Sequence, residues 1–132
     1  MAGPIVFISR FSVLPGQADA VADLLARAAE LIDSAKPATS LFAAYLDGAR
    51  SEARIVHAFA DADAMTTHFA GSDDRARALE GLVELSGFEL YGAAPVAAVE
   101  QLRREAAVAG GSLVEFPGFL GGFLRAGRSG GP

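Results

Sequence analysis

The hydrophobic period of this chain changes within its first third, and that change limits the folds it can adopt. Residues 5–13 read IVFISRFSV, rich in β-branched and aromatic side chains, which favours a strand. Pro15-Gly16 ends this strand. From Val21 to Ala35 apolar residues recur every three or four positions with charged residues between them, which predicts an amphipathic helix with one buried face.

Two extended segments follow this helix. Residues 39–46 and 54–59 are separated by the polar turn at Asp47-Gly48, and this spacing predicts an antiparallel hairpin.

Further helices and a fourth strand complete the chain. Asp61 or Asp63 can cap a second helix, because a carboxylate there accepts hydrogen bonds from unpaired amides. Further helical turns are expected within residues 73–85, a short strand at 88–91 and a third helix at 97–107.

The order strand–helix–strand–strand–helix–strand predicts an α+β, ferredoxin-like βαββαβ fold with an antiparallel sheet. With 132 residues the chain fits one core. We expect a domain over residues 1–108, including a C-terminal helix, and a tail over residues 109–132.

The predicted first strand is apolar on both faces. Phe7 and Phe11 lie on one side, and Val6 and Ile8 lie on the other. Helices cover one face of such a sheet, so the other face should be covered by a partner. We therefore expect a homodimer that encloses a ligand pocket between two sheets.

The tail is rich in glycine and phenylalanine. Eight of the fifteen glycines lie between Gly110 and Gly131. Three phenylalanines within residues 116–123 are costly to leave in water, so we expect this part to pack across the pocket mouth or onto the other subunit. Residues 125–132 are expected to form a loose end.

Composition excludes several classes of function. The chain has no cysteine and two histidines, so we expect no metal site. A net charge of −5 with scattered basic residues argues against nucleic acid. No signal peptide and no membrane-length apolar stretch is readable, so we expect a cytoplasmic protein with no membrane partner.

Residues 7–16, FISRFSVLPG, and the long helix after them resemble the antibiotic-biosynthesis monooxygenase (ABM-like) family. The resemblance continues through residues 57–61, HAFAD, and residues 64–68, a helix that ends near histidine. It covers roughly residues 5–91. Residues 87–104 also resemble a C-terminal extension of some bacterial relatives.

The resemblance implies a dimeric α+β barrel. It also implies a range of activities: oxidation of quinols and anthrone-type polyketides by O2 without a cofactor, heme degradation, and cyclisation. The cofactor-free anthrone oxygenases carry two asparagines and a tryptophan at positions that here hold Ser9, Ile55 and Phe59. Heme-degrading relatives have an axial histidine whose counterpart is His68.

Two histidines are candidates for chemistry. His57 shares a strand face with Ile55 and Phe59, and it is either a general base or substrate donor, or a buried neutral histidine. His68 lies at the end of a predicted helix. It is either a structural residue there, because the helix dipole favours a cation at this end, or a contact to substrate or heme.

Other residues are candidates for substrate binding. Arg10 either pairs with Glu89 or binds an acidic substrate, and Ser9 is a weak donor. The hydroxyls of Tyr45 and Tyr91 either contact a phenolic ligand or belong to core-edge tyrosines. An apolar wall for an aromatic ring is expected from Phe7, Phe11, Ile55, Phe59 and Met65.

The sequence hypothesis is therefore a cofactor-independent, monooxygenase-like enzyme that acts on an aromatic, quinol or polyketide-type molecule, with His57 as base. The alternatives are a polyketide cyclase, a non-catalytic ligand-binding or stress-response dimer, and heme binding through His68.

Overall fold

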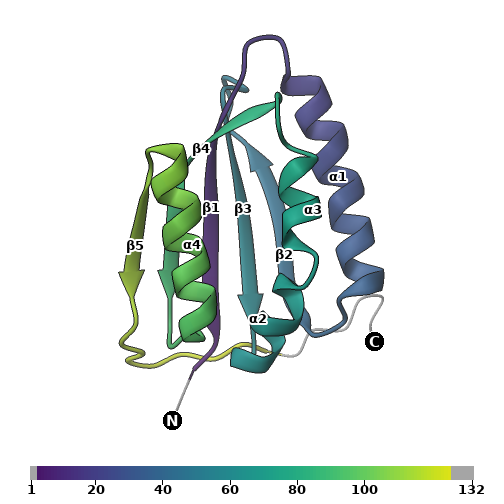
Figure 1. Ribbon diagram of the computed structural model, residues 1–132. Helices are drawn as coiled ribbons and strands as arrows, with labels where there is room; N and C mark the ends of the chain where they lie inside the picture. Colours follow the sequence, from purple (N-terminus) through teal and green to yellow (C-terminus); the bar gives the residue numbers. More distant parts are fainter. Residues whose placement is uncertain (1–2, 126–132) are drawn as a thin grey trace.

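A computed structural model describes residues 3–125 of the chain as one sheet with helices on one of its faces (Figure 1). The elements in chain order are β1 (Ile5–Val13), α1 (Ala18–Ala35), β2 (Thr39–Leu46), β3 (Glu52–Phe59), α2 (Ala62–Phe69), α3 (Ser72–Arg77), β4 (Val83–Tyr91), α4 (Val96–Ala109) and β5 (Ser112–Phe116). Within these described residues, no helix is long and apolar enough to cross a membrane. Residues 126–132 of the expected loose end lie outside the described part.

The sheet has the order β2-β3-β1-β4-β5. β1 pairs antiparallel with both β3 and β4, and β2 pairs antiparallel with β3. β5 alone runs parallel to its neighbour β4, and α4 makes the crossover between them. The predicted α+β, ferredoxin-like βαββαβ arrangement is confirmed.

Local sequence accounts for several element boundaries. α1 buries Val21, Leu25 and Ile32 on one face, as its period predicts. Asp61 caps α2, since its side chain accepts a hydrogen bond from the Ala64 amide at 2.9 Å. The first and second strands have the predicted bounds.

The structure contains a strand that the sequence pattern did not predict. Residues 112–116 form β5 at the edge of the sheet beside β4. Glycines permit this approach, because a Cβ at Gly111 would lie 2.4 Å from the Ser86 carbonyl oxygen and one at Gly87 would lie 2.4 Å from the Ser112 carbonyl oxygen. β4 also begins earlier than expected, at Val83 rather than Phe88.

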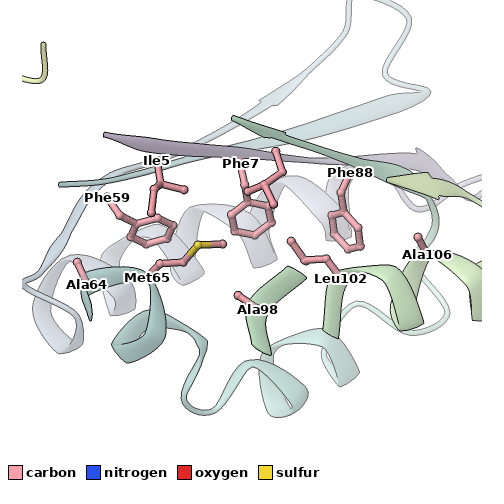
Figure 2. Close-up of a cluster of buried hydrophobic side chains, with 10 residues drawn as sticks. Ile5, Phe7, Phe59, Ala64, Met65, Phe88, Ala98, Leu102 and Ala106 are labelled. Carbon is pink, nitrogen blue, oxygen red and sulfur yellow. The ribbon is translucent and has the colours of Figure 1, made fainter. Parts of the chain in front are cut away.

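The core lies between the sheet and the helices. Figure 2 shows Phe7 and Phe59 on the sheet facing Met65 of α2 and Leu102 of α4. A second cluster joins Phe11 and Ile55 to the buried face of α1.

Within the described part of the chain, no helix lies on the other face of the sheet (Figure 1). Its side chains include half-buried Ile8 and Val56 and exposed Tyr45. Two aromatic residues after β4 contact other parts of the chain near this face. Phe116 stacks on Tyr91 with ring centroids 5.3 Å apart, and Phe119 lies against Gly3, just before β1. None of these tail residues lines the cavity described below.

Candidate functional site

A cavity of about 590 Å³ lies between the covered face of the sheet and helices α1, α3 and α4. Its walls are mainly apolar, with Phe7 and Phe11 from β1, Phe42 from β2 and Leu24 from α1. Its volume falls within the range of pockets that hold small organic molecules.

His57 of β3 presents a neutral imidazole to this cavity. Its Nδ1 donates to the Phe7 carbonyl oxygen at 3.1 Å, and because a carbonyl only accepts, Nδ1 carries the proton. The ring stacks on Phe7, with centroids 3.9 Å apart and planes 6° from parallel. Burial first, and then the charge of His68, lower the pKa of His57 from 6.5 to about 3. Nε2 is thus an unprotonated acceptor at neutral pH.

His68 lies beside it at the end of α2. The two imidazoles meet edge to face with centroids 5.2 Å apart, and both line the cavity. His68 Nδ1 is 2.8 Å from the Thr39 hydroxyl oxygen. Burial first, and then the charges of Arg75 and Lys36, lower the pKa of His68 to about 4. Both histidines are therefore neutral at physiological pH.

Arg75 contributes a positive charge to the cavity wall. Its guanidinium donates to the carbonyl oxygens of His68 and, at 3.1 Å, of Ala70. These carbonyls end α2, where the helix dipole favours a cation. Burial lowers the pKa of Arg75. Arg75 is not recognisable as a site residue from the sequence, because α3 is too short to give a clear helical period.

A polar pair from α4 lines another part of the wall. Gln101 Nε2 donates to the Ser72 hydroxyl at 3.0 Å and to Glu105 Oε2 at 2.9 Å, and all three residues line the cavity. Both amide hydrogens of Gln101 are then used, which leaves its carbonyl oxygen as an acceptor. Sequence reasoning missed this pair because its spacing is that of any exposed helix face.

Six of the residues selected from sequence come together on the cavity wall. They are Phe7, Ser9, Phe11, Ile55, His57 and His68. Ser9 is buried, and among the described residues its hydroxyl has no hydrogen-bond partner, so it can donate to a ligand.

The other selected residues lie elsewhere. Phe59 and Met65 are fully buried behind the wall of the cavity. The Phe59 ring packs against the His68 ring, with ring centroids 5.1 Å apart. Arg10, Tyr45 and Tyr91 lie on the opposite face of the sheet, because successive side chains of a strand point to opposite faces. They do not line the cavity.

The residues on that opposite face pair with one another. Arg10 forms an ion pair with Glu89 at 3.7 Å, one of the two interpretations that its sequence position left open. The Tyr91 hydroxyl donates to Glu89 at 2.6 Å, and this bond is the main cause that raises the pKa of Tyr91.

The position of the cavity differs from the sequence expectation of a pocket between two sheets. One chain forms it by itself, with the sheet as one wall and its own helices as the other. Helices cover this face because α1 and α4 bury apolar stripes against it. Residues 3–125 contain no group of three or more His, Asp or Glu side chains that could hold a metal ion.

No protein-family profile matches the sequence, and no curated protein matches it either. Solved structures do match. MupZ from Pseudomonas fluorescens superposes with a TM-score of 0.69 at 15% identity, over 93% of this chain and 95% of that one. SnoaB from Streptomyces nogalater, described as a cofactor-independent oxygenase, matches with a TM-score of 0.58 at 21% identity, over 72% of this chain and 97% of that one.

A candidate antibiotic biosynthesis monooxygenase from Deinococcus radiodurans also matches, with a TM-score of 0.58 at 22% identity, over 70% of this chain and 94% of that one. The MupZ match is long enough to include most of the segment after β4, whereas the other two have about the length of the βαββαβ part. The chain therefore has the α+β fold of the antibiotic biosynthesis monooxygenases, the family that its sequence resembles.

Proposed function

We propose that this protein is a cofactor-independent, monooxygenase-like enzyme whose substrate is an aromatic, quinol or polyketide-type small molecule. The observation that carries the proposal is the apolar cavity in whose wall two neutral histidines lie edge to face. Flat aromatic walls such as Phe7 and Phe42 suit a ring system. The fold shared with SnoaB, itself described as a cofactor-independent oxygenase, supports the same chemistry.

The reaction can be written without a cofactor. His57 Nε2 removes a proton from an activated C–H, and the resulting carbanion transfers electrons to O2. The carbon is oxidised as it gains one oxygen atom and loses two hydrogens, and the second oxygen leaves as water. Ser9 and Arg75 would orient the substrate and stabilise its developing negative charge.

The low pKa of His57 restricts this role. A base is most effective when its pKa is near the working pH, and about 3 is far below it. A carbanion formed beside the ring would favour the imidazolium by opposite charge, and so would raise this pKa in the complex. The base role therefore depends on a bound, charge-developing substrate.

The same pKa favours a second candidate function. A neutral imidazole that stays neutral acts as a hydrogen-bond acceptor, which suits a cyclase or a protein that binds its ligand without turnover. Such a protein would be stabilised by its ligand without consuming O2.

Oxygen uptake separates these functions. We expect the purified, metal-free protein to consume O2 with an anthrone or a hydroquinone faster than the substrate autoxidises, and His57→Ala to lose this excess. Tyr45→Phe is the matched control, because Tyr45 lies on the other face of the sheet. Uptake at the background rate would reject oxygenation of this substrate class and leave the cyclase and binding functions. A Soret shift with hemin that His68→Ala abolishes would instead indicate heme binding.

We also propose that a second copy of the chain covers the bare face of the sheet. One row of side chains on this face crosses the whole sheet and is apolar or aromatic throughout; it consists of Leu41, Ala58, Val6, Tyr91 and Phe116. The neighbouring row contains Val56 and Ile8 and reaches exposed Val114 past Glu89. Sedimentation should show a dimer that Val56→Lys dissociates, and a wild-type monomer at high concentration would contradict this.

A further inference from the structure

We propose that Thr39 is a positioning residue that fixes His68 as a hydrogen-bond donor into the cavity, beside the acceptor His57. The pair then recognises a neutral ligand that carries a hydroxyl and a carbonyl group close together on an apolar ring. This substrate class rests on the proposed function, because it requires that the cavity holds the ligand. The tautomer that Thr39 sets does not require it.

Thr39 reaches His68 because β2 contains a bulge. Simple alternation would place Thr39 on the bare face with Leu41 and Tyr45. The register changes between these positions: Thr39 is opposite Phe59 and Leu41 is opposite Ala58, so two residues of β2 span one step of β3. A bulge turns the following or preceding side chain to the other face. Thr39 therefore shares the covered face with Phe59 and contacts the imidazole.

The orientation of His57 follows from its carbonyl partner. Nδ1 must carry the proton to bond the Phe7 carbonyl, and the neutral ring then has a lone pair on Nε2. Among residues 3–125 no donor bonds this Nε2. His57 is an acceptor whatever the state of its neighbour.

The orientation of His68 follows from the hydroxyl of Thr39. If the hydroxyl donates to Nδ1 across the 2.8 Å contact, both groups are satisfied and Nε2–H is available to the cavity. If Nδ1 donated instead, the hydroxyl hydrogen would have no acceptor within the described chain, and both histidines would direct a lone pair into one apolar space. Two nitrogen lone pairs that face the same low-dielectric space repel each other, and this arrangement is unfavourable. The first arrangement is therefore the stable one.

Opposite tautomers define what the cavity recognises. One ring accepts and the other donates, with centroids 5.2 Å apart and no charge on either. A ligand hydroxyl can donate to His57 while an adjacent carbonyl accepts from His68. A ligand with a carbonyl alone leaves the buried acceptor of His57 unsatisfied, which costs affinity.

Nitrogen-detected NMR of the 15N-histidine-labelled, full-length protein tests the tautomers. We expect His57 to be protonated on Nδ1 and His68 on Nε2. Thr39→Val keeps the side-chain shape but removes the hydroxyl, and should convert the His68 signal to a mixture of tautomers or to the Nδ1-protonated form. Thr39→Ser should restore it, and His57 should be unchanged throughout.

The matched control is Thr66→Val, since the Thr66 hydroxyl donates to a helix carbonyl of α2 away from the cavity. It should leave both histidine signals unchanged. A wild-type His68 protonated on Nδ1, or a His68 tautomer unaffected by Thr39→Val, would overturn the positioning role.

Binding of three tetralones under anaerobic conditions tests the ligand class. We expect α-hydroxytetralone to bind roughly fivefold or more tightly than tetralone and α-methoxytetralone, as one additional buried hydrogen bond gives. Thr39→Val should weaken the binding of all three tetralones, because it removes the His68 donor from which each carbonyl group accepts, and Thr66→Val should not. Equal binding of all three would overturn the ligand class and leave the proposed function standing. Binding of none would contradict the proposed function itself, and with it the ligand class, while the NMR result would still decide the role of Thr39.

Discussion

The two faces of the sheet are built from alternate residues of the same strands, yet they have different chemistry. On the covered face, Ser9 and His57 lie among apolar side chains, and burial keeps the imidazole neutral. On the bare face, Arg10 and Glu89 remain partly exposed and stay paired. The difference shows that position relative to the helices, rather than residue type, decides which polar groups can act on a ligand.

The largest expected difference between the faces is in packing. Phe59→Ala removes a fully buried ring from the covered face and should lower the free energy of unfolding by about 3–5 kcal/mol. Tyr45→Ala on the bare face, where the side chain is 60% exposed, should cost less than about 1 kcal/mol in the isolated subunit. Urea denaturation of both variants at low protein concentration measures the two losses of unfolding free energy. Similar losses in the two variants would contradict the expected difference between the faces.

Acid should destabilise the covered face next. In the unfolded chain both imidazoles titrate near 6.5, whereas in the folded chain the pKa of His57 is about 3 and that of His68 about 4. Between these values the unfolded state binds more protons, so stability is complete above pH 6.5 and decreases as the pH falls through this window.

The protonation of these two histidines should lower the free energy of unfolding by several kcal/mol across this window, since one pKa unit corresponds to about 1.4 kcal/mol. Unfolding free energies measured at intervals across the window check it. His57→Phe should give a shallower dependence on pH than the wild type. An unchanged slope in the variant would show that the His57 pKa is not lowered by burial.

A smaller effect is expected at the sheet edge, where β5 extends both faces. Gly111→Ala places a methyl group against the Ser86 carbonyl oxygen, and should destabilise the protein by about 1–3 kcal/mol and accelerate hydrogen exchange in β5. Gly48→Ala is the control, because a Cβ there meets nothing within 4 Å and its effect should stay within about 0.5 kcal/mol. Equal exchange rates would mean that β5 does not need this glycine.

The smallest effect is expected from the charges of the bare face. Glu89→Gln removes the partner of Arg10, and because both side chains are more than a quarter exposed it should cost less than about 1 kcal/mol in the monomer. If a second copy covers this face, the loss of stability caused by Glu89→Gln should be larger at high protein concentration than at low concentration. Thermal unfolding over a range of concentrations checks this, and a cost independent of concentration would count against the covering copy.

The elements whose signals are local can be predicted from the sequence alone. The alternating apolar residues of β1, the period of α1 and the Asp61 cap of α2 are all properties of neighbouring residues. Alternation within β3 also groups His57 with Ile55 and Phe59 on one strand face, whereas the register between β1 and β3 brings Ser9 to the same wall.

Other features depend on pairing between distant segments, and local sequence does not predict them. β5 exists because two glycines let residues 112–116 approach β4, which its own composition does not indicate. The bulge that turns Thr39 toward His68 depends on the register between β2 and β3. The cavity lies on the sheet face against which the helices pack, and the opposite face remains bare. Local periodicity specifies that a strand face is apolar, but it does not specify what covers that face.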